Sequence, residues 1–517
     1  MKSAKPSENR YRQERVGGCR GQVSGTAVAL MAALTLAGCT TVGPDFRPPQ
    51  PPVMGSYTAT ALPGQTVEAA GVGGVSQRFV SGKEIPEAWW TLFRCDPLDR
   101  LIRQAIDESP TLALARARIV EAQENRRAQF GALLPNADAN LSYSRQKIAG
   151  VEFGQSGAQI DPFTLMGASV NVSYTFDLFG ATRRQLEALD AQIEFQQFQL
   201  EGAHLTLSST IVVNAVREAS LRSKIRATQE IIALQEQALR LVERRLELGH
   251  VPASDLLAQR AQLAQTLASL PPLERDLEQT RHQLAVLTGK LPAEAALPEF
   301  HLAEMHLPEE LPLSLPSSLA RQRPDIRAAE ALLHAASARV GVATAHLYPQ
   351  VTLTGSFGSM SDTPGSLFNG PSTIWNLGAG LLQPLFRGGT LSAQKRAAVA
   401  LYDQAMAEYR QTLLTSFQNV ADVLRALEAD ARGLKAQTES EAIAAESLDL
   451  TRKQFERGAV NFLSLLNGQR QYQEALLNTV QAQAARFSDT AALFQSLGGG
   501  WWSRGPQHLA EARLAGE

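Results

Sequence analysis

Two long proline-free stretches constrain this chain more than any other feature of its sequence. No proline occurs from Phe163 to Val251 or from Leu385 to Gly505, and alanine, leucine, glutamine, glutamate and arginine persist through both. These residue types favour the α-helix, whereas proline ends it. The portion from Gly180 to Leu248, about 69 residues at about 1.5 Å each, predicts a helix of roughly 100 Å. No globular domain needs such a helix, so we expect an elongated, mostly α chain.

The second proline-free stretch carries a narrow apolar seam. Val420, Leu424, Leu427, Ala431 and Leu434 are spaced by four and three residues. This heptad-like spacing is typical of a helix that packs along a neighbouring helix. A rod-like coiled coil would explain these helices, but it gives no role to the amphipathic segments described next.

Four shorter segments alternate apolar and polar residues. In the clearest one, Val170, Val172, Tyr174, Phe176 and Leu178 alternate with Asn171, Ser173, Thr175 and Asp177, and the pattern recurs at residues 351–357 and more weakly at 136–143 and 375–386. A period of two residues predicts strands with one apolar and one polar face. Such strands suit a transmembrane barrel, because lipid accepts only helices or closed sheets. A soluble hairpin packed on helices is the alternative.

The order of strands and helices occurs twice along the chain. Four pairs of motifs recur in the same order at separations of about 207 to about 214 residues. The pairs are Leu133-Leu134-Pro135-Asn136 with Leu347-Tyr348-Pro349-Gln350, Asp177-Leu178-Phe179-Gly180 with Pro384-Leu385-Phe386-Arg387-Gly388, Leu248-Gly249-His250-Val251 with Arg457-Gly458-Ala459-Val460, and Asp255-Leu256-Leu257 with Ser464-Leu465-Leu466. We expect a first repeat at residues 89–302, a second at 303–500 and a tail at 501–517, each repeat holding a strand pair and long helices.

The N-terminus has the features of an export signal. Basic residues precede an apolar run from Ala27 to Ala37, which is too short to span a bilayer. The run ends in Leu36-Ala37-Gly38-Cys39, a pattern that resembles a bacterial lipobox, in which the cysteine is acylated. We therefore expect residues 1–38 to be removed, Cys39 to carry a covalent lipid, and residues 39–88 to form an extended tether. A plain signal peptide with an incidental cysteine is the alternative.

Charge and motif content exclude several functional classes. The formal net charge is −2 and no Lys/Arg run with interleaved aromatics occurs, so nucleic acid is a poor partner. The segment His301 to His306 misses the HExxH metal-binding spacing and is expected to be a solvated loop. Cys95 is expected to be an inert single thiol. We expect no catalytic set, metal or cofactor, so energy coupling must belong to a partner.

Four further motifs are specific to one family when taken together. They are Val42-Gly43-Pro44-Asp45-Phe46, Trp89-Trp90-Thr91-Leu92-Phe93, Arg323-Pro324-Asp325-Ile326-Arg327 and Gly498-Gly499-Gly500-Trp501. With them the chain resembles the OprM/NodT lipoprotein branch of the TolC-like outer-membrane factors along nearly its whole mature length. The resemblance implies a homotrimer whose protomers each give four strands to one twelve-stranded β-barrel and their long helices to a periplasmic helical barrel.

The resemblance also implies a function and partners. It implies a lipid-anchored channel in the outer membrane, with a large periplasmic portion, that serves as the exit duct of a tripartite efflux pump. A periplasmic adaptor and an inner-membrane transporter of the RND type would supply drugs or other small molecules. Drugs, metals, organic solvents and siderophores all remain open as cargo.

Two other classes of lipid-anchored protein fit the sequence less well than a channel does. A periplasmic adaptor lipoprotein would have one helical hairpin and extensive soluble β domains, instead of a duplicated plan. A lipid-anchored hydrolase would need a convergent acid, base or nucleophile set, which these residues do not offer.

A periplasmic gate is expected at two helix corners, where Gly249 and Gly458 relieve the change of chain direction. In TolC-like channels the second corner narrows the mouth through a tyrosine and an aspartate, and the resemblance aligns these with Phe455 and Asn467. Asp255 keeps its acid in the first corner, and its candidate partners are Arg244, Arg245, Arg452 and Arg457. We expect closure to depend on packing of Phe455 and Leu463 more than on charge. Solvated helix ends are the alternative, because exposed ion pairs contribute only about 0–1 kcal/mol.

Overall fold

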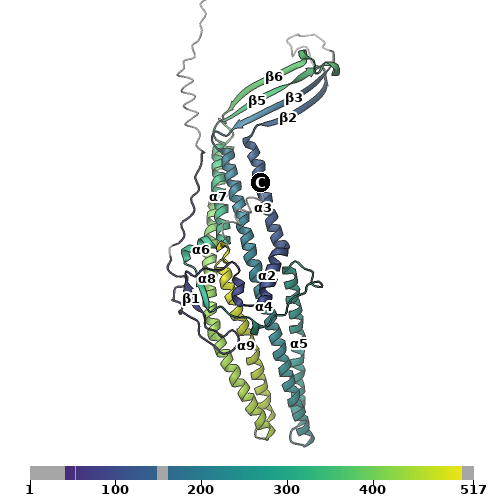
Figure 1. The fold of residues 1–517 in the computed structure, drawn as a ribbon, viewed down its shortest axis with the longest axis vertical. Coiled ribbons are helices and arrows are strands. Elements are labelled where there is room, and N and C mark those ends of the chain that lie inside the picture. The colour runs from purple at the N-terminus through teal and green to yellow at the C-terminus, as the bar shows by residue number, and fades with distance from the viewer. Residues whose placement is uncertain (1–40, 53, 148–160, 504–517) are drawn as a thin grey trace, which may run out of the picture.

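The computed structural model describes residues 41–52, 54–147 and 161–503. The molecule is elongated, with four strands at one end and long helices that run away from them (Figure 1). The expected signal peptide, Cys39, and residues 504–517 of the expected tail lie outside the described residues. Within the described part, no helix is both long enough and apolar enough to cross a membrane.

The main helices come in pairs of matching length. α3 (Pro110–Phe130) and α7 (Pro324–Ala345) have 21 and 22 residues, α4 (Ala181–Glu247) and α8 (Thr390–Glu456) have 67 each, and α5 (Ala253–Leu287) and α9 (Phe462–Ser496) have 35 each. The prediction of a helix from Gly180 to Leu248 is confirmed to within one residue at each end. Equal lengths in the two halves confirm the duplicated plan.

The apolar seam predicted in the second half lies along α8 and is buried. Val420, Leu424, Leu427 and Leu434 are 0% exposed, and Ala431 is 1% exposed. The first three of these side chains belong to the main hydrophobic core, together with Phe487 and Phe494 of α9. The helix is stabilised mainly by burial of this apolar face and less by the helix propensity of its residues.

Residues 64–82 do more than tether the chain. β1 (Arg78–Ser81) pairs in parallel with β4 (Glu310–Leu313) of the inter-repeat linker. The fully buried Arg486 of α9 donates hydrogen bonds to the carbonyl oxygens of Gly73 and Val75, at 3.3 and 2.9 Å. A buried guanidinium must find acceptors, and these carbonyls provide them. The expectation of an extended tether did not include this strand or these contacts.

The remaining short elements lie in different parts of the molecule. Four contribute residues to the main hydrophobic core, namely η1 (Trp89–Phe93), α2 (Asp96–Glu108), η4 (Leu302–Glu304) and α6 (Pro316–Gln322), and η7 (Trp501–Ser503) packs against it. η2 (Gly131–Leu133) leads into the first strand of the four-stranded sheet, and η5 (Pro364–Ser366) and η6 (Gly370–Ser372) lie in the loop between its last two strands. The expectation of a solvated loop from His301 to His306 is wrong for its apolar residues, because Leu302 and Met305 are 3% and 4% exposed and belong to the core.

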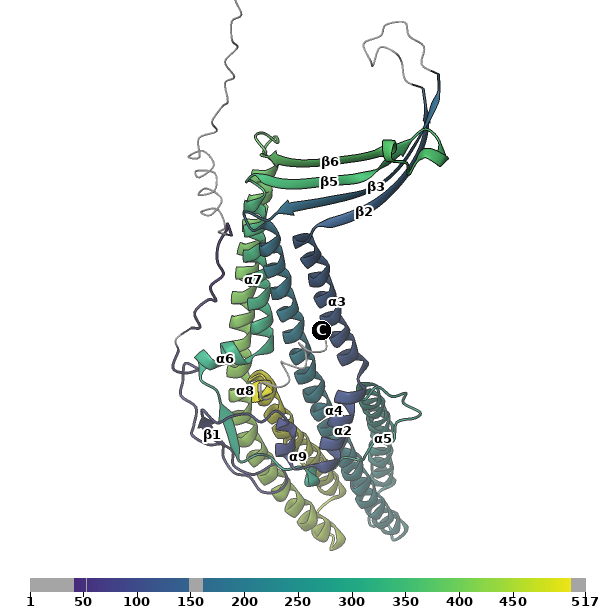
Figure 2. The same ribbon diagram turned by 45° about the horizontal axis from the view of Figure 1, so that its top comes forward.

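The four strands form one antiparallel sheet, ordered β2 (Asn136–Gln146), β3 (Phe163–Phe176), β5 (Gln350–Ser361) and β6 (Thr373–Leu382). Two strands from each half are therefore confirmed, although β3 begins before the predicted segment and ends at Phe176. Figure 2 shows the strands side by side, turned away from the axes of the helices.

The strand register gathers the apolar side chains on one face of the sheet. Val170 lies opposite Phe357, and Phe357 lies opposite Trp375, so these three residues share a face across three strands. On the other face, Thr175 and Thr352 are paired and their hydroxyl oxygens are 3.1 Å apart. The apolar face is open in the single chain, where Phe357 and Trp375 are 65% and 75% exposed. An apolar face this exposed needs lipid or another chain to cover it.

Candidate gate at the paired helix corners

Both helix corners end in the same hydrogen-bonded motif. After α4, Gly249 N donates to Leu246 O and His250 N donates to Arg245 O, both at 2.9 Å. After α8, Gly458 N donates to Phe455 O at 3.0 Å and Ala459 N donates to Gln454 O at 2.9 Å. This is the Schellman motif, which needs a left-handed residue, and the φ angles of Gly249 and Gly458 are +73° and +74°. The two glycines predicted at the corners therefore close equivalent turns.

The chain restarts differently after each turn. At α9, the side chain of Asn461 accepts a hydrogen bond from the backbone N–H of Ser464 at 3.0 Å. Pro252 precedes α5 and supplies no side-chain cap. An asparagine cap stabilises a helix start by about 1 kcal/mol, so the second corner is the better anchored of the two.

A small apolar cluster lies just inside the corners. Phe455 and Phe462 are 1% and 5% exposed, and their ring centroids are 6.2 Å apart in an edge-on arrangement. Ala238 and Val242 of α4 belong to the same cluster, with Leu465 and Leu466 of α9. The cluster therefore joins the coil of the first repeat, formed by α4 and α5, to the coil of the second repeat, formed by α8 and α9.

Arg245 forms a second link between the coils. Its guanidinium carbon lies 4.5 Å from the centroid of the Phe455 ring, and its Nη2 donates to the carbonyl oxygen of Glu456 at 2.9 Å. A guanidinium over an aromatic face is attracted by the ring quadrupole, and the effect is worth about 0.5–2 kcal/mol. The carbonyl it binds belongs to the last turn of α8, where helix carbonyls lack partners within the helix.

The other residues predicted for the gate lie apart from this cluster. Leu463 is 59% exposed and Asn467 is also exposed, so both are free to face a neighbouring molecule. Asp255 is half-buried, and no ion pair involves it among the described residues. Three of its four candidate partners are engaged elsewhere: Arg245 with Phe455 and Glu456, Arg244 with Glu247 at 2.9 Å, and Arg452 with Asp449 at 2.8 Å. Arg457 forms no ion pair among the described residues.

A groove of about 360 Å³ lies beside the corners, between α4 and the second coil. Leu241, Leu448 and Leu465 line it together with Arg452, Glu456 and Tyr472. The groove thus combines apolar side chains with charged ones at the same end of the molecule as the gate cluster.

Cys95 lies far along the chain from the corners, at the N-cap position of α2, where its side chain makes no capping hydrogen bond. It is 8% exposed, and burial raises the pKa of its thiol, which keeps the thiol protonated. In the part of the chain that the structure describes, no group of three or more His, Cys, Asp or Glu side chains could hold a metal ion. Cys39, the expected lipidation site, lies outside the described residues.

Sequence reasoning missed the actual contact of Arg245. It named Arg245 only as a candidate partner of Asp255, because charge complementarity was the available signal. Arg245 contacts Phe455 and Glu456 only because the two corners lie side by side in the fold. Residues about 210 positions apart leave no pattern in the local sequence that would predict this contact.

The chain matches the family described as "Outer membrane efflux protein" over residues 101–290 and 315–499. It is 32% identical to the pyoverdine export outer membrane protein OpmQ of Pseudomonas aeruginosa over 421 residues, which cover 80% of this chain and 88% of that protein. It is 27% identical to the probable outer membrane lipoprotein SilC of Salmonella typhimurium, covering 92% of this chain and 98% of that protein. The solved outer-membrane channel OprN superposes with a TM-score of 0.80 at 26% identity, covering 89% of this chain and all of that one.

Proposed function

The chain belongs to the outer membrane efflux protein family, and on this premise we propose that it works as a homotrimer, coupled to a periplasmic adaptor and an inner-membrane transporter of the RND type. The protein is an outer-membrane efflux channel and not an enzyme. In the proposed assembly it is the exit duct for drugs or other small molecules that the transporter delivers.

The open four-stranded sheet is the observation that supports a barrel made of several copies. The outer edges of β2 and β6 have no partner strand among the described residues, and one face of the sheet is apolar and exposed. Within lipid, every backbone N–H and C=O must be paired, so an open sheet edge cannot remain there. Four strands are too few to close a barrel, so several copies must join; the number three comes from the resemblance to TolC-like factors, in which three copies bring twelve strands and leave no edge.

The lengths of the helices support a duct that extends far into the periplasm. α4 and α8 have 67 residues each, so each spans about 100 Å. Both begin next to the sheet and end at the paired corners, where the gate cluster lies (Figure 1). A molecule that enters at the corners would therefore leave at the strands.

Acylation of Cys39 is part of the proposal. The lipobox-like Leu36-Ala37-Gly38-Cys39 supports it, as does the printed name of SilC, a probable lipoprotein. Palmitate labelling should be present in the wild type and absent in Cys39→Ser, while the channel still assembles. Undiminished labelling of Cys39→Ser would exclude this anchor.

The groove beside the corners is the proposed contact for the adaptor. It lies at the end of the helices farthest from the strands, where a periplasmic partner can reach it, and its leucines can pack against an amphipathic helix. A photo-crosslinking residue in place of Arg452 should capture the adaptor, and one in place of Arg145 in β2 should not. Equal capture at both positions would contradict this contact.

The homotrimer is tested by the mass of the detergent-extracted protein. We expect an unheated sample to run as a trimer and a boiled sample as a monomer, and we expect adaptor and transporter to co-purify with the unheated form. A monomer that nevertheless conducts ions in a bilayer would overturn the trimer.

A further inference from the structure

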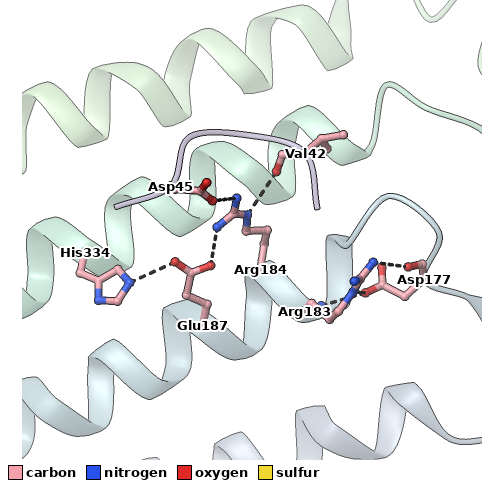
Figure 3. Close-up of polar contacts among 7 residues, drawn as sticks. All are labelled: Val42, Asp45, Asp177, Arg183, Arg184, Glu187 and His334. Carbon is pink, nitrogen blue, oxygen red and sulfur yellow. Dashed lines mark hydrogen bonds and ion pairs between the residues drawn. The ribbon is translucent and has the colours of Figure 1, made fainter. Parts of the chain in front are cut away.

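Residues 41–46, which follow the expected lipid site, lie in a fitted position against α4 and α7. Val42 N donates to the carbonyl oxygen of Phe179, and Arg184 Nε donates to the carbonyl oxygen of Val42, both at 3.2 Å. Figure 3 shows the segment crossing above Arg184, close to the turn that joins β3 to α4. The segment is thus bound to the end of the helical body nearest the strands.

Arg184 is the centre of this contact. Its side chain is only 5% exposed, and it pairs with Asp45 and with Glu187, each at 2.7 Å. Burial acts to lower the pKa of Arg184, but hydrogen bonds to these two carboxylates and their charges outweigh it, and the pKa is raised. A buried guanidinium is tolerated only when it is paired, and one of its two carboxylates comes from the N-terminal segment.

Phe46, the residue after Asp45, is held by a second contact, with His334 of α7. The other carboxylate oxygen of Glu187 lies 3.0 Å from His334 Nε2, and the His334 ring is stacked on Phe46 with centroids 4.4 Å apart. The chain of contacts therefore starts at Asp45, passes through Arg184, Glu187 and His334, and ends at Phe46. The chain of contacts thus begins and ends on two consecutive residues of the segment, Asp45 and Phe46.

Close backbone approaches show that the segment is fitted to this surface. A Cβ atom on Gly43, whose φ is +101°, would lie 2.4 Å from the Cα of Gly341 in α7. A Cβ on Gly341 would in turn lie 2.9 Å from two carbons of the Arg184 side chain. A Cβ on Gly180 would lie 2.5 Å from a methyl carbon of Thr41. Three glycines thus allow three close contacts that any other residue would disrupt.

We propose that Arg184, Gly341 and His334 form a receptor site for the chain's own Gly43-Pro44-Asp45-Phe46 segment, and that this site fixes where the lipid anchor enters the membrane. The inference rests on the proposed acylation of Cys39. Only Thr40 separates Cys39 from Thr41, so the Cα of Cys39 lies within about 7 Å of the Cα of Thr41, which contacts Gly180 at the junction of strand and helix. Arg184 is a positioning residue in this account.

Without the site, the anchor would be free over a much larger area. The next part of the chain that lies against the body is residues 48–51, which line a groove with Ala320, Arg327 and Tyr409. Nine residue steps separate Cys39 from Pro48, so without the site the lipid-bearing residue could move as far as about 30 Å from that groove. Binding of residues 42–46 replaces this long tether by a short one, so the body is held at a set depth relative to the bilayer.

Hydrogen exchange of the full-length protein in detergent tests the receptor site. In the wild type, the amide of Val42 should be protected from exchange, because it donates to the carbonyl oxygen of Phe179. Arg184→Gln should raise the exchange rate of the Val42 amide at least about tenfold, and Asp45→Asn should do the same. Asp45 is 87% exposed, so its variant cannot fail simply by misfolding.

Two further variants sharpen the test. Gly341→Ala should also release the segment, although alanine is the better helix former by about 1 kcal/mol. Arg183→Gln is the matched control: Arg183 is the neighbouring residue, but it bonds Asp177 at 3.3 Å and does not touch the segment. Unchanged exchange in Arg184→Gln and Asp45→Asn, or equal release in Arg183→Gln, would overturn the proposal.

A palmitate label separates this inference from the proposed acylation. Arg184→Gln should keep its label and lose protection of the Val42 amide, whereas Cys39→Ser should lose its label and keep this protection. Loss of protection in Cys39→Ser would show that the lipid holds the segment and not the reverse, which would overturn the receptor site. Absence of label in the wild type would refute the acylation and, with it, the role of the site in placing an anchor, whereas binding of the segment to Arg184 would still be decided by the exchange of the Val42 amide.

Discussion

The guanidinium of Arg245 lies over the ring of Phe455, 4.5 Å from its centroid, and thereby ties the last turn of α4 to the last turn of α8. Phe455 is itself 1% exposed, within a cluster that α4, α8 and α9 share. The α4–α5 and α8–α9 hairpins of one protomer are therefore joined at their tips by packing, by a cation–π contact and by the hydrogen bond from Arg245 to the Glu456 carbonyl. Separation of the hairpins would break all three, which makes this point a physical basis for the proposed gate.

Substitution of Gly458 should destabilise the corner because its φ angle is positive, and not because an added side chain would lack space. An added Cβ would meet only the Arg245 Nη2, at 4.0 Å, but φ is +74°. A left-handed conformation costs a non-glycine residue about 1–2 kcal/mol. Gly458→Ala should therefore raise the exchange rate of amides at residues 454–462 by about tenfold, as measured by hydrogen exchange.

Gly433 provides the control on the same helix. It lies inside α8, and an added Cβ would meet no atom within 4 Å. Gly433→Ala should stabilise the helix by about 0.5–1 kcal/mol, because glycine loses more entropy on folding than alanine. Equal destabilisation by both substitutions would show that the corner has no special backbone requirement.

The sheet should be labelled on one face only. The register puts Val172, Tyr174 and Phe176 on the apolar face, so cysteines there should resist a membrane-impermeant maleimide in intact outer membranes. Cysteines in place of Asn171, Ser173 and Thr175 should react, because their face lines the water-filled lumen. Comparable labelling of the two sets would argue against a barrel in lipid.

Stability should fall as pH rises toward 7 because of a carboxyl pair between α8 and α9. Burial, a hydrogen bond to Asp489 and the charge of Asp489 raise the pKa of Asp430 to about 7, against a lowering effect of Arg486. The folded protein thus binds more protons than the unfolded chain between about pH 4 and 7. This stabilisation is present at low pH and is lost as pH rises through about 7.

Asp430→Asn should remove this dependence. Between pH 5 and 8, the apparent melting temperature of the wild type in detergent should fall more than that of the variant. Asp449→Asn is the control, because hydrogen bonds from Lys453 and Arg452 lower the pKa of Asp449 and its contribution disappears only at acid pH. Identical pH profiles of the melting temperature in the wild type and in Asp430→Asn would contradict a raised pKa of Asp430 in the folded protein.

The fold could be predicted where its signal is periodic and local. Alternation from Val170 to Phe176 indicated a strand, and the seam from Val420 to Leu434 indicated a helix contact, because each pattern repeats along one element. Strand β1 was missed, since four residues that pair with a linker more than two hundred residues away leave no period. The inward turn of Leu302 was missed for the same reason.

The site was predictable only in part. Glycines mark the two corners, because a Schellman turn requires a left-handed residue at a fixed place. Arg245 and Glu456 are 211 residues apart, and Arg184 and Asp45 are 139 apart, so neither pair has a local signature. Charge alone suggested Asp255 as a partner for arginines that the fold engages elsewhere.

Conductance of the purified protein in planar bilayers tests the central claim, that this is a duct held shut by packing at the corners. Phe→Ala substitutions in a core cost about 3–5 kcal/mol, far more than an exposed ion pair. Phe455→Ala should therefore raise the resting conductance several-fold, while Ile443→Ala, at a position 68% exposed on the same helix, should not. Wild-type conductance should rise with salt only in proportion to bulk conductivity. No change in Phe455→Ala, together with a steeper rise with salt, would contradict the account and show that ion pairs hold the gate.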